Sequence, residues 1–97
     1  MRPVIYIAGK YSDKSPDLVQ KNIDKARKVA IQLWQEGFAV FCPHLNTENF
    51  HLLPEFQENA EDIFYDGDLA ILRFCQALFL LVQHPMYSCL VFISTLM

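Results

Sequence analysis

A small set of residues in this chain could bind or transform a small molecule, and it falls into three short stretches. The residues are Tyr6, Ala8, Gly9, Lys10, Tyr11, His44, Asn46, Asp66 and Asp68. Hydroxyl, imidazole, amide and carboxyl groups can hydrogen-bond a ligand, and a lysine ammonium can bind a phosphate as a point charge. The stretches are far apart in the sequence, so they form a site only if the fold brings them together.

The first stretch follows a predicted β-strand. The β-favouring run from Val4 to Ile7 leads into small residues, and an amphipathic helix pattern comes soon after, which predicts a strand over residues 3–8 of a parallel α/β sheet. Ligands of open α/β sheets bind outside the carboxyl ends of the strands, so we expect residues 6–11 near a ligand. Gly9 would let the backbone turn tightly and let a ligand approach it. An ordinary buried strand and turn remains the alternative, because the chain has no glycine-rich dinucleotide or P-loop motif.

A long helix is predicted over residues 16–36. Ser15 and Pro16 match the preferences of a helix start, and Gly37 suits a left-handed cap at the other end. Apolar residues recur at three- and four-residue steps and form one stripe. The stripe consists of Val19, Ile23, Ala26, Ala30, Leu33 and Trp34. We therefore expect Trp34 to lie in the core.

The second stretch follows a second predicted strand. Residues 38–42 are apolar throughout, as in a parallel strand that is covered on both faces. His44 and Asn46 come directly after it and are expected on the ligand side of the sheet. Residues 48–59 lack a clear period, which predicts a loop with a helical turn around residues 54–57.

The third stretch belongs to a second predicted helix over residues 59–74, with a break near Gly67. This places Asp66 and Asp68 at or inside the helix start, from where they could reach the other two stretches. An aspartate pair around a glycine is also common in simple turns and caps. A third strand is predicted over residues 76–83.

The composition favours a single small globular domain over residues 1–97. Hydrophobic residues make up 53% and charged residues 20% of the chain. A net charge of −3 argues against a nucleic-acid partner, and the apolar runs are too short for a membrane span. The three cysteines include no C-x-x-C pair and no signal peptide is visible, so we expect reduced thiols and a cytoplasmic location.

A metal site is the other chemistry to consider. Cys42, His44 and His51 could ligate zinc, but Cys42-Pro43-His44 is not a zinc-binding spacing and no second ligand pair follows. We therefore predict neither a metal nor a cofactor. His44 is expected to hydrogen-bond in the wall of a pocket.

Taken in order, several segments resemble the nucleoside 2-deoxyribosyltransferase-like family, and its short bacterial and phage members most closely. The resemblance covers about residues 3–83. The segments that carry it are Tyr6-Ile7-Ala8-Gly9-x-Tyr11, Asn22-Ile23 with Ala26, Leu33-Trp34-x-x-Gly37, Val40-Phe41-Cys42-Pro43-His44-Leu45-Asn46-Thr47 and Gly67-Asp68-Leu69.

The resemblance implies a flavodoxin-like three-layer domain that holds a 2′-deoxynucleoside or its 5′-monophosphate. Family members cleave the N-glycosidic bond by way of a glutamate nucleophile, and they pass the deoxyribose to another base or to water. Such retaining transfer needs a carboxylate nucleophile and a proton donor to the leaving group. By match of motif, Tyr6 would orient the nucleophile, Asp68 would bind or protonate the base, and Gly9 and Lys10 would line the pocket.

This chain departs from the family pattern at two places. Lys10 stands where the family usually has proline, and its charge is expected to favour a phosphate. The family glutamate follows the third strand in a segment of the type S-x-G-x-x-x-E, but this chain has His84-Pro85-Met86-Tyr87-Ser88-Cys89-Leu90 there and no acidic residue after Asp68. The domain is therefore predicted to be truncated or altered at its carboxyl end, with a divergent tail over residues 84–97.

The expected function is binding of a deoxynucleoside or its monophosphate, with the glycosidic chemistry impaired. A catalytically inactive nucleotide-binding module and an oligomeric interaction protein remain as alternatives. A homo-oligomer is expected because the final residues are apolar and uncharged, and because the relatives assemble into oligomers. Residues 89–97 could form a final strand or a short helix.

Overall fold

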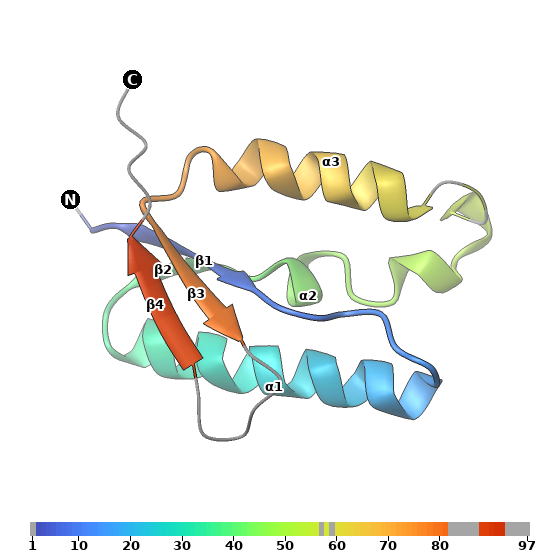
Figure 1. Cartoon of the computed structure of the whole chain (residues 1–97), viewed down its shortest axis with the longest axis horizontal. Coiled ribbons are helices and arrows are strands. Elements are labelled where there is room, and N and C mark those ends of the chain that lie inside the picture. Colours follow the sequence, from blue (N-terminus) through green and yellow to red (C-terminus); the bar gives the residue numbers. More distant parts are fainter. Residues whose placement is uncertain (1, 57, 59, 82–87, 93–97) are drawn as a thin grey trace.

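The structure is a computed structural model that describes residues 2–56, 58, 60–81 and 88–92, the last segment by its backbone alone. Figure 1 shows a small sheet with helices packed along it. In chain order the elements are β1 (Val4–Ala8), α1 (Pro16–Gln35), β2 (Ala39–Phe41), α2 (Pro43–Asn46), the 3-10 turns η1 (Phe50–Leu52) and η2 (Pro54–Phe56), α3 (Ala60–Leu72), β3 (Ala77–Leu81) and β4 (Ser88–Phe92).

The sheet has the strand order β2-β1-β3-β4. β1 pairs in parallel with β2 on one side and with β3 on the other, with Tyr6 opposite both Phe41 and Leu78. The predicted α/β fold with three parallel strands is confirmed. β4 pairs antiparallel with β3, so residues 88–92 of the tail form a strand, while residues 84–87 and 93–97 lie outside the described residues.

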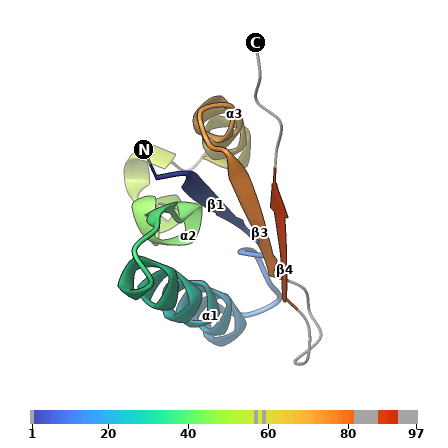
Figure 2. The same ribbon diagram turned by 90° about the vertical axis from the view of Figure 1, so that its left-hand side faces the viewer.

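Alternate residues of β1 face different helices. Ile5 and Ile7 pack into the main core with Ala26 and Leu33 of α1, and all of these side chains are buried. Tyr6 points to the other face, where α3 lies. Figures 1 and 2 show α1 and α3 on opposite sides of the strands. Because side chains alternate along a strand, β1 directs Ile5 and Ile7 into the main core and Tyr6 toward α3.

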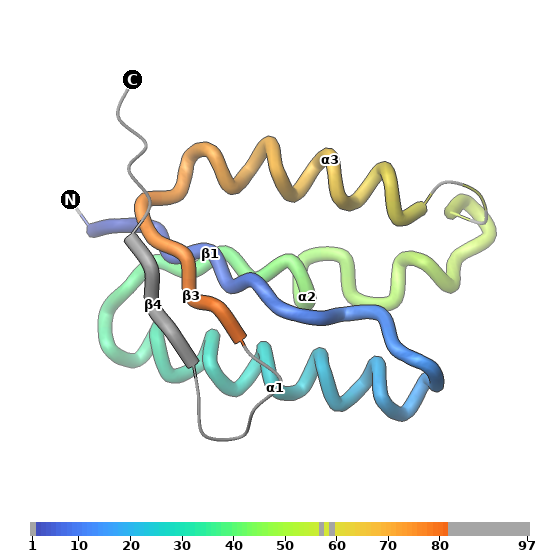
Figure 3. The backbone as a smooth tube through the Cα atoms, viewed as in Figure 1, coloured from blue at the N-terminus to red at the C-terminus, as the bar shows by residue number. Residues whose placement is uncertain are grey.

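α1 begins and ends as its sequence predicts. The Ser15 hydroxyl accepts a hydrogen bond of 3.3 Å from the Leu18 N–H, and Pro16 occupies the first turn. At the other end Gly37 adopts a left-handed backbone with φ of 98°, which glycine reaches without steric cost. The loop of residues 9–15 carries the chain from the end of β1 to this helix start (Figure 3).

The prediction that Trp34 lies in the core is wrong, because its side chain is 56% exposed. Successive helical residues are about 100° apart around the axis, so Leu33 and Trp34 cannot both point at the sheet. Leu33 takes the buried position, together with Ile23, Ala26 and Ala30.

The predicted break of the second helix near Gly67 is also wrong. α3 runs without interruption from Ala60 to Leu72, and Asp66 and Asp68 therefore lie in its second half and not at its start. A side chain at position 67 would meet no atom within 4 Å, so glycine here is not required by packing. No α3 residue is fully buried. In the described residues, no helix is both long and apolar enough to cross a bilayer.

Candidate functional site

A cavity of about 320 Å³ lies at the carboxyl end of β1, between α2, α3 and the loops after β1 and α2. Its lining includes most of the residues expected from the sequence. These are Tyr6, Ala8, Gly9, Tyr11, His44 and Asp68. Three segments that are far apart in the sequence therefore meet at one hollow.

Tyr6 and Asp68 both line the cavity, and the charge of Asp68 acts on the Tyr6 phenol. Tyr6 is buried on β1, where its ring centroid lies 5.7 Å from that of Phe41. Burial raises the pKa of the Tyr6 phenol, and the negative charge of Asp68 raises it further, so the phenol keeps its proton. Burial also raises the pKa of the Asp68 carboxyl above its ordinary value of 3.8. Asp68 can therefore exist as an acid over a wider pH range than an exposed aspartate.

His44 is a neutral, nearly inaccessible wall residue. Its side chain is only 3% exposed, and its Nε2–H donates to the Lys10 carbonyl oxygen at 3.0 Å. Burial lowers the pKa of the imidazole, more than the contact with the Lys10 carbonyl raises it. With Nε2 protonated, Nδ1 is an acceptor, and this buried atom has no hydrogen-bond partner among the described residues. The predicted hydrogen-bonding role in a pocket wall is confirmed for Nε2.

Tyr11 joins the loop after β1 to the segment after α2. Its hydroxyl oxygen accepts a hydrogen bond of 2.9 Å from the Asn49 N–H and lies 3.4 Å from Nδ1 of His51. The ring also contacts the imidazoles of His44 and His51 at centroid distances of 5.7 and 5.5 Å. Asn49 holds a left-handed backbone with φ of 61°, a conformation that asparagine tolerates better than most residues.

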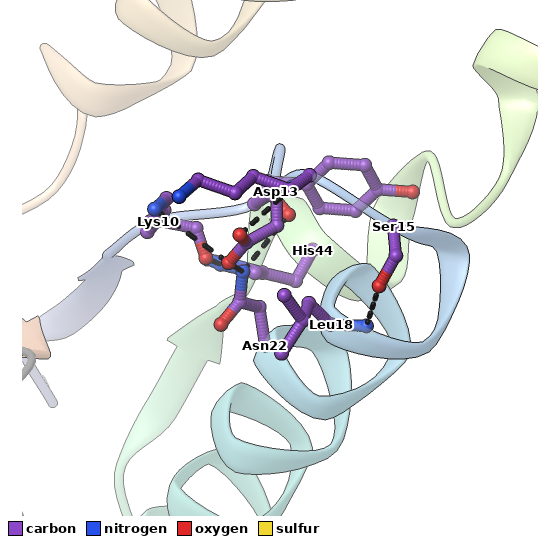
Figure 4. A network of polar contacts seen from close by, with 8 residues as sticks. Lys10, Asp13, Ser15, Leu18, Asn22 and His44 are labelled. Atoms are coloured by element: carbon purple, nitrogen blue, oxygen red, sulfur yellow. Dashed lines mark hydrogen bonds and ion pairs between the residues drawn. The ribbon is translucent and has the colours of Figure 1, made fainter.

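A polar network ties the loop of residues 9–15 to α1 (Figure 4). The Asn22 amide donates to the Tyr11 carbonyl and to the Asp13 carboxylate, both at 3.1 Å. The Lys14 N–H donates to the other Asp13 oxygen at 2.8 Å, and these two donors lower the pKa of Asp13. Asn22 therefore positions Tyr11 from outside the cavity.

Lys10, Asn46 and Asp66 do not line the cavity. The Lys10 ammonium lies 3.6 Å from the Asp13 carboxylate, while only its backbone carbonyl faces His44 (Figure 4). Asn46 borders a separate shallow hollow between α1 and β2, next to Trp34. Asp66 is exposed on α3, because it lies two residues, or about 200°, away from Asp68 around the helix.

Close packing against Leu81 requires a glycine at position 9, in addition to the expected roles in the turn and in ligand approach. A Cβ at this position would lie 2.9 Å from Cβ of Leu81, at the end of β3, and 3.1 Å from its Cδ1. Contacts this short are essentially never seen for real Cβ atoms, so a side chain at position 9 would push the two strand ends apart.

The structure adds lining residues that sequence reasoning missed. The polar and aromatic ones are Thr47, His51, Glu61, Phe64 and Tyr65. Glu61, Tyr65 and Asp68 are spaced four and three residues apart, which places them on one face of α3. That spacing can be read from the sequence, but a helix break at Gly67 would have placed Asp68 on a different face from Glu61 and Tyr65.

In the described residues, no group of three or more His, Cys, Asp or Glu side chains could hold a metal ion. Cys42 and Cys75 are free, buried thiols whose pKa values are raised by burial, and neither lines the cavity. The lining groups suit hydrogen bonding, stacking and proton transfer. Comparisons with protein-family models, with curated proteins and with solved structures find no match to this chain.

Proposed function

We propose that this protein binds a 2′-deoxynucleoside or its 5′-monophosphate in the cavity beside Tyr6 and Asp68. The observation that carries the proposal is that the buried Tyr6 and the partly buried Asp68 line one cavity at the carboxyl end of β1, together with several aromatic rings. Rings such as Tyr11, Phe64 and Tyr65 can stack on a planar base, and a volume of about 320 Å³ is at the lower end for small-molecule pockets.

The order β2-β1-β3 supports the same proposal. It is the start of the flavodoxin-like strand order, in which ligands bind outside the carboxyl ends of the strands near the switch point at the first strand. The cavity occupies that place. A flavodoxin-like domain altered at its carboxyl end remains part of the proposal.

The reaction associated with this pocket is cleavage or transfer at the N-glycosidic bond. Asp68, with its raised pKa, can protonate the departing base, and the Tyr6 phenol can orient a neighbouring group. The chain has no acidic residue after Asp68 to serve as the family nucleophile. We therefore expect covalent transfer to be slower by several orders of magnitude than with such a nucleophile.

Isothermal titration calorimetry with deoxyadenosine, thymidine and their monophosphates tests the binding. Asp68→Asn should weaken it, whereas Asp62→Asn, which makes the same change at an exposed position of α3, should leave it unchanged. Heat signals that are absent for every compound would refute the proposal. A base-release assay on the same samples separates an enzyme from a catalytically inactive binding module.

A further inference from the structure

The charges of the cavity lining are unbalanced. Two carboxylates, Glu61 and Asp68, line it, and no lysine or arginine does. This statement covers the whole chain, because all eight lysines and arginines lie in the described ranges. The cavity therefore has two carboxyl groups in its lining and no lysine or arginine side chain.

Neither carboxylate has an ion-pair partner among the described residues. Ion pairs between described residues join Lys10 to Asp13, and Arg27 to Asp24 and Glu48. Lys10, the cation that is closest in sequence to the site residues, is thus held by Asp13 outside the cavity. Glu61 is exposed, whereas Asp68 is partly buried. A partly buried carboxylate without a counter-charge is unfavourable, and a ligand that carries a positive charge removes this cost at Asp68.

The two imidazoles of the lining make contacts within the protein. His44 is kept neutral by burial and donates through Nε2 to a backbone carbonyl. Nδ1 of His51 lies 3.4 Å from the Tyr11 hydroxyl oxygen, and the two rings are T-shaped to each other.

Aromatic rings in the lining favour the same kind of ligand. Tyr6, Tyr11, Phe64 and Tyr65 line the cavity together with the two carboxylates. Aromatic faces attract cations, and the attraction is larger where water is excluded. A phosphate would instead meet two like charges, so the expected preference of Lys10 for a phosphate does not extend to this cavity.

From these observations we infer that the cavity selects a nucleoside whose base carries a positive charge, such as an N1-methylated adenine, over neutral nucleosides and nucleotides. This inference rests on the proposed nucleoside site and names its ligand class. A cationic base favours the ionised form of Asp68 over its acid form, so that Asp68 and Glu61 provide the counter-charge, and the aromatic rings of the lining provide stacking and cation–π contacts.

Two isomeric ligands separate charge from size. 1-Methyl-2′-deoxyadenosine carries a positive charge near neutral pH, whereas N6-methyl-2′-deoxyadenosine has the same added methyl group and is neutral. We expect calorimetry to show about tenfold tighter binding of the charged isomer, which corresponds to ~1.4 kcal/mol. Deoxyadenosine monophosphate should bind more weakly than either isomer.

Matched variants identify the origin of the preference. Glu61→Gln should remove most of it, while Asp62→Asn, the neighbouring exposed carboxylate of the same helical turn, should retain it. Circular dichroism of each variant establishes that it is folded. Persistence of the preference in Glu61→Gln and in Asp68→Asn would overturn the inference, since the carboxylates would then not be its source.

The failure of the inference and the failure of the proposed function give different results. Equal binding of the two isomers would overturn the selection for charge and leave the nucleoside site standing. Binding of neither isomer, nor of deoxyadenosine, would refute both.

Discussion

The Tyr6 and Asp68 side chains illustrate how burial prepares a proton donor. Tyr6 is buried on β1, an inner strand of the sheet, and Asp68 is partly buried on α3. Because desolvation disfavours the charged forms, the pKa values of both groups are raised. A carboxyl group that retains its proton more readily is suited to act as a general acid.

The raised pKa of Asp68 makes a prediction for stability against pH. The folded state binds the Asp68 proton more tightly than the unfolded state, so this group favours folding below its ordinary pKa of 3.8 and loses that contribution as pH rises through the folded pKa. The Asp68→Asn side chain cannot ionise, so the variant does not lose this contribution to stability as the pH rises. The stability of the variant relative to the original should therefore increase between about pH 4 and pH 7. Urea denaturation at several pH values measures this, and a difference that stays constant or shrinks would contradict it.

Gly9 and Gly67 form a matched pair at the residue scale. Gly9→Ala places a Cβ 2.9 Å from Cβ of Leu81, so overpacking should lower the free energy of unfolding by about 1–3 kcal/mol. Gly67→Ala adds the same atom in open space within a helix and should raise it by about 0.5–1 kcal/mol.

Urea denaturation measures the free energy of unfolding of both glycine variants, and each variant serves as the control for the other. An equal effect at the two positions would mean that packing against Leu81 does not distinguish them.

At the scale of elements, the loop between β1 and α1 is held from outside the cavity. Asn22 on α1 donates to two acceptors of this loop, one of them the carbonyl of Tyr11. The hydroxyl of the same tyrosine accepts from Asn49 in the segment after α2. Tyr11 is thereby fixed at both its backbone and its side chain, which favours a cavity that is formed before a ligand arrives.

Removal of this anchor should affect both stability and binding. Asn22→Ala loses two hydrogen bonds, so we expect the free energy of unfolding to fall by about 1–3 kcal/mol, less the gain from the better helix propensity of alanine. Nucleoside affinity should fall as well, because Tyr11 loses its orientation. Lys21→Ala, at an exposed neighbouring position of α1, is the control. Unchanged affinity in a folded Asn22→Ala protein would argue against a positioning role of the loop.

At the scale of the whole molecule, much apolar surface is exposed. Phe74 is 76% exposed, and Ile63 and Leu69 of α3 are exposed as well. The expectation of a homo-oligomer first rested on the apolar tail, but Ser88–Phe92 pairs with β3 of its own chain. The exposed apolar residues on and beside α3 now provide the stronger reason to expect self-association.

Light scattering at micromolar concentrations tests the assembly. We expect a mass that is a multiple of 11.3 kDa, because large exposed apolar surfaces usually mark interfaces. A single species of 11.3 kDa would show that this surface stays in contact with water. Phe74→Ser, which removes the most exposed of the large apolar side chains, should shift the distribution toward the monomer.

The sequence by itself determined most of the elements. Apolar and β-favouring runs predicted three parallel strands, apolar patterns predicted both long helices, and Ser15, Pro16 and Gly37 located the ends of α1. These features could be predicted because they depend on neighbouring residues and on local backbone preferences. The same reasoning was wrong for Trp34 and for the break at Gly67. In both cases the prediction used one residue and its neighbours, whereas the outcome depends on how the whole helix packs.

Only the tertiary structure decided which side chains share the cavity. Glu61 and Tyr65 join Asp68 because α3 is unbroken and turns this face toward Tyr6, while Asp66 points away. Lys10 is excluded because its ammonium pairs with Asp13. Distances between segments that are remote in sequence depend on strand order and on the rotation of each helix about its axis. Hydrophobic patterns in the sequence restrict the possible strand orders and helix rotations, but side-chain packing selects the one that forms.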